Sequence, residues 1–383
     1  MRINGSATSS TTTEFASPFS NGDVRPVNAT AASRTPFRVA DRAAGVVRVE
    51  APGRLHLGFL DPSATLGRRF GSAGLAIDGM ATIVEASFDQ AEAVVAEDDA
   101  ARREVDRVRE HVATLRRLWN IEAPLRVTLR RTLPPHAGFG SGTQLALALA
   151  HAIAALQSRQ VSAAEAAEAL ARGARSGAGI AAFVQGGFLV DAGHGDAVAP
   201  PPIIARMEFP DAWRIVLVMD ESLDGLHGGA EATAIAALPT FAAERAAELC
   251  HRLVMQVLPG IVERDFDRFA GGLTAIQDAN GSYFAPAQGG GMYVSRAVSR
   301  VLGFVRERFP SAVGQSSWGP TGFAFVASQA VADDVVAALG DAGLLEPRIR
   351  LVTVRGRNRG ARITRLRAHG DAATPTSEAR DRV

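Results

Sequence analysis

Three glycines at alternate positions mark the stretch of sequence best suited to chemistry. Gly138, Gly140 and Gly142 lie in a loop that an apolar, alanine-rich run, Leu145 to Leu156, follows closely. Glycine lets a backbone approach a ligand closely and adopt positive φ. A helix beginning here would direct its free N–H groups and positive dipole end at the loop, as in an anion site, most simply for phosphate. An ordinary strand-to-helix turn is the alternative, and the hydroxyl of Ser141 beside the glycines favours the anion site.

The basic residues restrict the kind of phosphate site. The chain has 41 basic residues and no lysine, so every one of them is arginine. A Walker A loop needs its lysine, which excludes the ordinary P-loop. Any phosphate must therefore be bound by backbone N–H groups and by guanidinium groups, which contact phosphate through two parallel hydrogen bonds.

A second set of polar residues follows the first predicted strand. Arg54 and His56 alternate with apolar residues, so both point to one face, and Asp61 and Arg68 come shortly after. The set offers two guanidinium groups for phosphate, an imidazole, and a carboxylate for Mg²⁺ or a polar group of a substrate. An exposed polar strand face is the alternative interpretation.

Two further loops have the composition of ligand-binding segments. Residues 173–179 (GARSGAG) form a second glycine-rich turn, and residues 314–322 (GQSSWGPTG) precede an apolar strand. In the latter, Trp318 is placed to stack on a ring, although a surface turn explains the segment equally well. Small and hydroxyl residues allow such loops to close over a ligand with their backbone N–H groups.

Composition excludes several classes of protein. A formal net charge of +1 and 6% aromatic residues argue against nucleic acid and membrane surfaces as partners. No apolar run reaches the length of a membrane span, and residues 1–44 lack the apolar core of a secretory signal. The single cysteine, Cys250, allows no internal disulfide, which is consistent with a reducing cytoplasm. We expect a disordered extension over residues 1–44 and a flexible tail over residues 369–383.

The pattern of elements favours an α+β fold of two domains. Strands are predicted at residues 46–50, 54–59, 81–86, 125–130, 188–190, 213–219, 323–326 and 349–354, with a loop over residues 65–74. Helices are predicted at residues 99–118, after the glycine loop, from the capping box Ser162-x-x-Glu165, over much of residues 241–280 and at residues 331–339. Strands and helices mix without strict βαβ alternation. We place an N-terminal domain at residues 45–212 and a C-terminal domain at residues 213–368.

Three segments together resemble the GHMP kinase superfamily: residues 51–59 (APGRLHLGF), 135–143 (PHAGFGSGT) and 319–325 (GPTGFAF). The resemblance covers most of residues 45–365. It implies an N-terminal split β-α-β domain and a C-terminal ferredoxin-like domain, with the nucleotide or diphosphate loop between them.

Departures from the superfamily's kinases bear on the activity. Many of its kinases have a second serine in the central loop, where this chain has Gly142, and an aspartate in a Ser-Gly-x-Asp turn, where this chain has Gly179. A chain that keeps the phosphate loop and lacks that carboxylate is poorly suited to phosphoryl transfer.

The strings at residues 54–75, 136–144 and 175–180 resemble one branch in particular, the β-ribofuranosylaminobenzene 5′-phosphate synthases. The resemblance implies condensation of 4-aminobenzoate with phosphoribosyl diphosphate, releasing CO₂ and pyrophosphate, in tetrahydromethanopterin biosynthesis. It also implies Mg²⁺ as cofactor and a homodimer. No residue can be matched to the para substituent of the ring, so 4-hydroxybenzoate stays open as the substrate.

The resemblance suggests roles for individual residues. Arginine suits the benzoate carboxylate and the 5′-phosphate, and Arg54, Arg68 and Arg175 are the candidates for these contacts. Asp61, Arg68, Arg54 and His56 are the candidate catalytic residues, with Asp61 also the candidate Mg²⁺ ligand, and alanine at Asp61 or Arg68 is expected to abolish turnover without unfolding the protein. The candidate residues for substrate and diphosphate are Gly138, Gly140, Ser141, Gly142, Thr143, Arg175, Ser176 and Thr321. Two alternatives are an ATP-dependent small-molecule kinase and a relative without activity that senses a metabolite.

Overall fold

The computed structural model describes residues 45–173, 176–195, 200–223, 225 and 228–367. The expected N-terminal extension, the expected tail and Arg175 lie outside the described residues. Between residues 45 and 367 the chain forms one compact unit. No helix in this described part is long and apolar enough to cross a membrane.

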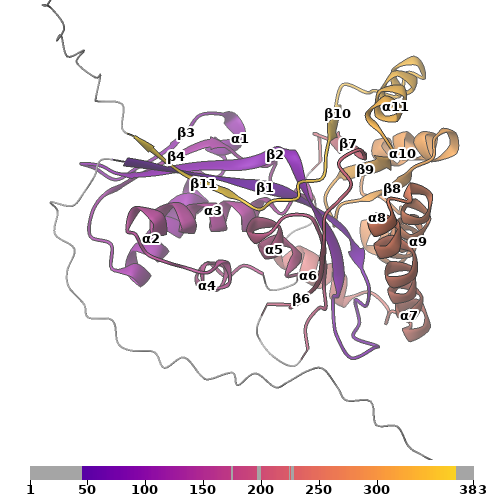
Figure 1. Ribbon diagram of the computed structural model, residues 1–383, viewed down its shortest axis with the longest axis horizontal. Helices are drawn as coiled ribbons and strands as arrows, with labels where there is room; N and C mark the ends of the chain where they lie inside the picture. The colour runs from indigo at the N-terminus through magenta and orange to yellow at the C-terminus, as the bar shows by residue number, and fades with distance from the viewer. Residues whose placement is uncertain (1–44, 174–175, 196–199, 224, 226–227, 368–383) are drawn as a thin grey trace, which may run out of the picture. The chain divides into compact units, whose positions relative to one another are not determined.

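The first sheet is built on two long strands, β1 (Gly45–Phe59) and β2 (Ser72–Phe88), which run antiparallel to each other (Figure 1). Among the described residues it has seven strands. Five follow the order β11-β1-β2-β4-β3, while β5 pairs with the first residues of β2, and β6 with β5. Of these described strand pairs, β3 with β4 is the parallel one. The remaining members are β3 (Ala93–Ala96), β4 (Leu125–Arg131), β5 (Phe188–Asp191), β6 (Ile203–Met207) and β11 (Arg362–Arg367).

Five helices accompany the first sheet: α1 (Asp99–Arg102), α2 (Val105–Trp119), α3 (Ser141–Leu156), α4 (Ala163–Ala169) and α5 (Ala178–Val184). Helix α3 contacts β1 and β2 and is buried along most of its length. Its alanines and leucines pack against Val49, Val84 and Val127 of the strands. The burial of this apolar helix fixes where the glycine loop before it must lie.

The second sheet has four antiparallel strands in the order β10-β7-β9-β8. Numbered along the chain this order is 4-1-3-2, that of a ferredoxin-like domain, so the expected C-terminal fold is confirmed. Its strands are β7 (Arg214–Asp220), β8 (Ala312–Gln315), β9 (Thr321–Val326) and β10 (Ile349–Val354). The helices that follow β7 are α6 (Gly228–Ala236), α7 (Ala243–Arg252), α8 (Leu258–Glu263), α9 (Phe266–Phe284), α10 (Arg296–Arg308) and α11 (Gln329–Asp341), with a π-helical turn at Leu253–Val257 and a 3₁₀ turn at Ala285–Gln288.

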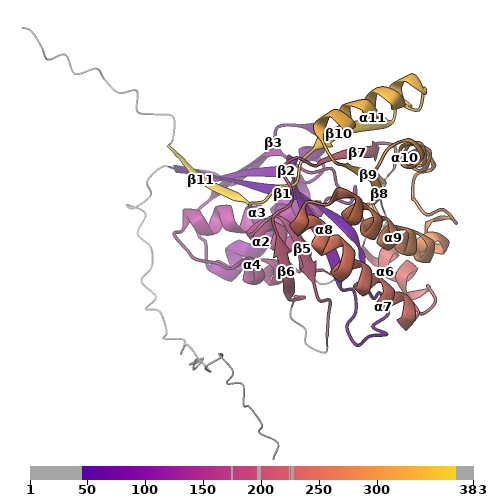
Figure 2. The same cartoon turned by 45° about the vertical axis from the view of Figure 1, so that its right-hand side comes forward.

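Strand β7 is buried on both faces, as its continuous apolar sequence requires. Val216 and Val218 face helices α10 and α11. Ile215 and Leu217 face the opposite way, into a core that also contains Leu55 of β1. Figure 2 shows helices α7, α8 and α9 beside this core. The two sheets therefore share one apolar core in the region of the glycine loop.

Several boundaries differ from the sequence prediction. The predicted strands at residues 46–50 and 54–59 are one strand, β1, and β2 begins at Ser72, inside the predicted loop of residues 65–74. The predicted helix at residues 99–118 is broken between α1 and α2. Strand β11 lies beyond residue 213 in sequence and still pairs with β1 of the first sheet.

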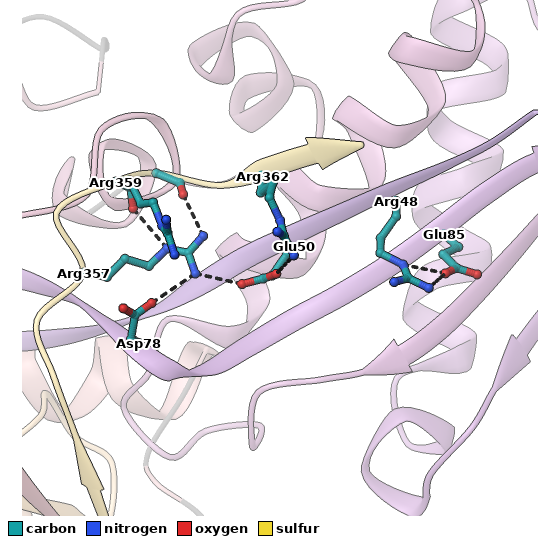
Figure 3. Close-up of polar contacts among 8 residues, drawn as sticks. Arg48, Glu50, Asp78, Glu85, Arg357, Arg359 and Arg362 are labelled. Carbon is teal, nitrogen blue, oxygen red and sulfur yellow. Dashed lines mark hydrogen bonds and ion pairs between the residues drawn. The ribbon is translucent and has the colours of Figure 1, made fainter. Parts of the chain in front are cut away.

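An arginine near the end of the chain ties β11 to the first sheet (Figure 3). The buried Arg357 donates to Glu50 Oε1 at 2.8 Å and Asp78 Oδ1 at 3.2 Å, and to the carbonyls of Arg359 and Gly360. Burial would raise the pKa of Glu50, but the hydrogen bond and charge of Arg357, and then those of Arg362, lower it overall. These contacts of Arg357 and Arg362 thus hold the ionised carboxylate of Glu50 against β11.

Arg357→Ala should lower the free energy of unfolding by about 2 kcal/mol, because it leaves partly buried Glu50 and Asp78 without this charged partner. Urea denaturation measures the loss, and Arg355→Ala, at an exposed neighbouring position, is the control. Equal stabilities for the two variants would contradict a structural role of Arg357.

Candidate functional site

Helix α3 begins with an uncapped N-terminus. Its N-cap residue is Gly140, whose φ of 71° lies in the left-handed region, and no side chain caps the helix. The N–H groups at a helix N-terminus carry the positive end of the helix dipole. The N–H of Thr143 already donates to the carbonyl of Gly140 at 3.1 Å, whereas those of Ser141 and Gly142 have no acceptor among the described residues. This geometry suits an anion, and the role of the glycine loop as an anion site stays a prediction.

The loop before α3 is clamped between β1 and the turn that joins β8 to β9. Ser316 Oγ donates to the carbonyl of Gly138 at 2.7 Å and accepts from the N–H of His56 at 2.9 Å. The N–H of Arg54 donates to the carbonyl of Phe139 at 3.0 Å. A Cβ on Gly138 would lie 2.3 Å from the carbonyl oxygen of Ser316, so this glycine serves the close approach of two backbones.

Arg54 lies directly against the start of α3. A Cβ placed on Gly140 would be 3.7 Å from Arg54 Nη2. Arg54 Nε is buried and has no hydrogen-bond partner among the described residues. Burial lowers the pKa of Arg54 to about 10, and the negative charge of Asp191 offsets part of this effect. The guanidinium therefore stays charged at neutral pH and is available to a ligand on the helix N-terminus.

His56 is buried behind Arg54 and held in its neutral form. Its Nδ1 accepts from the N–H of Gly58 at 3.3 Å, and its ring packs on Phe59 at 4.4 Å between centroids. Burial, and then the charge of Arg54, lower its pKa well below the usual value. A small cavity of about 30 Å³ adjoins His56 and Trp318. That volume suits ordered water and not an aromatic ring, and Trp318 itself packs on Phe284.

A buried carboxylate that sequence analysis missed lies between the strands and the second glycine turn. Asp191, fully buried at the end of β5, accepts from Ser72 Oγ at 2.6 Å and Ser176 Oγ at 2.7 Å through Oδ2, and from the N–H of Gly193 at 3.0 Å. Burial raises its pKa, while the bonds from Ser72 and Ser176 act against this. Asp191 thereby positions Ser176, a predicted site residue, near Arg54.

Asp61 and Arg68 organise the loop between β1 and β2. Asp61 accepts from the N–H of Ser63 at 3.1 Å and of Leu66 at 2.7 Å, and from Thr65 Oγ1 at 3.3 Å. Arg68 Nε donates to the carbonyl of Ala192 at 2.8 Å, and its Nη2 to that of Gly193. Arg68 therefore reaches the turn after Asp191. Both side chains have structural partners, so we now expect their alanine variants to loosen this loop as well, and their catalytic roles stay predictions.

The other predicted residues fall at different distances from the helix N-terminus. Thr143 lies in the first turn of α3, where its Cγ2 would be 3.4 Å from a Cβ on Gly179. Ser141 and Gly142 are partly exposed in the same turn. Thr321 is fully buried at the start of β9, so it offers no surface to a ligand in this conformation.

A second arginine that sequence analysis missed also reaches this helix. Arg172, just after α4, places Nη1 3.5 Å from where a Cβ on Gly142 would be, and its Nε is buried without a hydrogen-bond partner in the described part of the chain. Its position depends on the turn that ends α4, where Ala171 takes a φ of 52°. No spacing in the sequence signals that contact.

The donor set for a metal ion is sparse. No group of three histidine, cysteine or acidic side chains suited to a metal occurs among the described residues. Both oxygens of Asp61, the predicted ligand, already accept hydrogen bonds from their own loop. The described side chains therefore form no cage for Mg²⁺, an ion that proteins often hold through one or two carboxylates together with substrate phosphates.

The fold and the loop define a class of protein. Residues 106–187, which include the glycine loop, match the family model for the N-terminal domain of GHMP kinases. Among solved structures, homoserine kinase from Cytophaga hutchinsonii shares the fold at a TM-score of 0.60 and 16% identity, over 86% of this chain and 100% of that one. Mevalonate diphosphate decarboxylase from Staphylococcus aureus gives 0.58 and 13%, over 84% and 98%. The protein therefore has the GHMP kinase fold.

Sequence similarity is specific to one branch of that class. The β-ribofuranosylphenol 5′-phosphate synthase of Methanothermobacter thermautotrophicus is 30% identical over 334 residues, which cover 82% of this chain and 97% of the relative. The synthase of the same name from Archaeoglobus fulgidus is 29% identical, over 74% and 89%. This chain belongs to the β-ribofuranosylphenol 5′-phosphate synthase family.

The buried neutral His56 should make the protein less stable in acid. Its folded pKa lies below the unfolded value, so the unfolded state binds the extra proton and stability falls as pH drops below about 6.5. Urea denaturation between pH 8 and pH 5 should show a smaller loss for His56→Gln than for the wild type. His251→Gln, at an exposed position, should keep the wild-type slope. A His56→Gln slope equal to that of the wild type would contradict this account.

Proposed function

We propose that the protein joins the ribose of phosphoribosyl diphosphate to a para-substituted benzoate, 4-aminobenzoate or 4-hydroxybenzoate, with release of CO₂ and pyrophosphate. The observation that carries the proposal is the likeness to named synthases across almost their whole length, 97% of one relative. The uncapped helix N-terminus with Arg54 beside it supports the same conclusion, because it suits a diphosphate group.

The proposed reaction breaks and forms bonds at carbon. The bond between the anomeric carbon and the diphosphate oxygen breaks, and the electron pair leaves with pyrophosphate. The ring carbon that bears the carboxylate, made electron-rich by the para amine or hydroxyl, attacks the anomeric carbon. The bond to the carboxylate then breaks, CO₂ departs, and its electron pair restores the aromatic ring. No protein nucleophile, oxidant or reductant is required.

The residues of the site would act on the leaving group. The N–H groups of Ser141 and Gly142 and the guanidinium of Arg54 would stabilise the negative charge that develops on the diphosphate oxygens. The hydroxyl of Ser316 and the backbone N–H of Arg54 hold the loop so that these donors are already in place. We retain Mg²⁺ as a proposal: bound to the diphosphate oxygens, it would supply further positive charge there.

Two other activities fit less well. A kinase needs a carboxylate to receive the proton of the acceptor alcohol, and Asp191, the carboxylate near Ser176, is fully buried and already accepts three hydrogen bonds. Against a sensor without activity, the chain keeps Arg54, His56, Asp61 and Arg68 together with the glycine loop, and tight binding without turnover would support that alternative. We further propose that the protein acts in the cytoplasm as a homodimer, in tetrahydromethanopterin biosynthesis.

Radiolabelled substrate tests the proposal. The protein is incubated with Mg²⁺, phosphoribosyl diphosphate and carboxyl-labelled 4-aminobenzoate or 4-hydroxybenzoate in separate reactions. We expect labelled CO₂ and pyrophosphate in equal amounts, and the faster reaction identifies the ring. ATP consumption with an alcohol, and no CO₂ from either benzoate, would contradict the proposal.

Arg54→Ala should reduce turnover at least about 100-fold, the range for losing one donor to a developing oxyanion. Arg355→Ala, on the exposed surface, is the control and should keep wild-type turnover. Comparable rates for the two variants would remove Arg54 from the site.

A further inference from the structure

Two guanidinium groups lie against the start of helix α3. Arg54 lies 3.7 Å from where a Cβ on Gly140 would be, and Arg172 lies 3.5 Å from where a Cβ on Gly142 would be. Gly140 is the left-handed N-cap residue and Gly142 lies in the first turn of the helix, so the two arginines contact different positions at one helix N-terminus. The proposed function gives Arg54 to the diphosphate.

Arg172 has little opposite charge around it. Burial, and then the charge of Arg107, lower its pKa, and Glu104 acts in the opposite direction. Glu104, the residue before helix α2, already forms an ion pair at 2.8 Å with Arg107 of that helix. Arg172 is thus a second partly buried cation at this helix without an ion-pair partner in the described part of the chain. Such a group is costly to bury unless a ligand supplies the opposite charge.

His111 adds an independent sign of a ligand on the Arg172 side. It lies one helical turn after Arg107 on α2 and is 9% exposed, and its Nε2 is buried with no hydrogen-bond partner among the described residues. Burial, and then the charges of Arg172 and Arg107, lower its pKa to about 4, so the imidazole is neutral at neutral pH. A buried polar atom without a partner usually has a water or ligand in the functional state.

We propose that Arg172, His111 and the adjoining N–H groups of α3 form a second phosphate subsite, which binds the 5′-phosphate of the ribose substrate. This inference rests on the proposed function, in which Arg54 takes the diphosphate. Phosphoribosyl diphosphate carries anionic groups at two positions of one sugar, and the site offers two guanidinium groups at different positions of one helix N-terminus. A phosphate monoester supplies the acceptor oxygens that a guanidinium binds in pairs.

Calorimetric titration with separate halves of the substrate tests the assignment. Ribose 5-phosphate and inorganic pyrophosphate are titrated into the wild type, Arg172→Gln, and the control Arg117→Gln, which changes an exposed arginine on α2. We expect Arg172→Gln to weaken ribose 5-phosphate binding at least about tenfold, the effect of losing one charge-assisted hydrogen bond. Pyrophosphate affinity, and both affinities of the control, should stay at wild-type values.

The outcomes separate this proposal from the function on which it rests. Loss of pyrophosphate affinity with ribose 5-phosphate binding intact would move Arg172 to the diphosphate side and overturn the subsite, while the synthase activity stands. A wild type that releases no CO₂ in the radiolabel assay would instead overturn the function. A thermal melt checks that Arg172→Gln is folded. If it is not, His111→Asn provides the same test, and unchanged ribose 5-phosphate affinity in that variant overturns the subsite.

Discussion

The hydroxyl of Ser316 bridges the two segments on which the site depends. It donates to the carbonyl of Gly138 in the glycine loop and accepts from the backbone of His56 on β1. Because Ser316 comes from the turn between β8 and β9, this one side chain connects both sheets to the start of α3. The helix N-terminus can act on a ligand without rearranging only because the loop is held in this way.

The site uses arginine where many phosphate sites use lysine, and the structure shows what this requires. Arg54 and Arg172 lie against positions where Gly140 and Gly142 leave room, since a side chain there would occupy the space beside each guanidinium. A planar, permanently charged group of this kind binds phosphate oxygens with defined geometry. The same fold serves homoserine kinase and mevalonate diphosphate decarboxylase at 16% and 13% identity, so the chemistry depends on such local residues and not on the fold.

Local patterns in the sequence predicted much of the architecture. The capping box of Ser162 and Glu165 and the glycine-loop helix are present, as are the predicted strands β7, β9 and β10. Strand β8 was not predicted, and the ferredoxin-like arrangement was implied by the family resemblance. The strand predicted at residues 81–86 is shorter than β2, in part because Gly74, a residue type common in loops, was placed in the predicted loop. Its backbone instead pairs within the sheet, and a Cβ there would lie 3.3 Å from Arg54 Cδ and 3.1 Å from Ala178 Cβ. That glycine is required by packing between segments distant in sequence.

Asp191 and Arg172 were not predicted for the same reason, because their contacts join segments that are distant in sequence. Asp191 reads as an ordinary acidic residue at a strand end, and only the pairing of β5 with β2 brings it to Ser72 and Ser176. Arg172 depends on the turn after α4. In contrast, Arg54 and His56 could be proposed together as candidates because strand alternation is a local property, and their roles stay predictions.

The central claim is that the N-terminus of α3 and Arg54 hold a diphosphate whose bond to carbon breaks. The most direct measurement is a crystal structure of the protein with pyrophosphate and ribose 5-phosphate. The account predicts pyrophosphate within hydrogen-bond distance of the N–H groups of Ser141 and Gly142 and of the Arg54 guanidinium. Pyrophosphate bound elsewhere, or an adenine nucleotide in this position with its terminal phosphorus aligned on an alcohol, would contradict it.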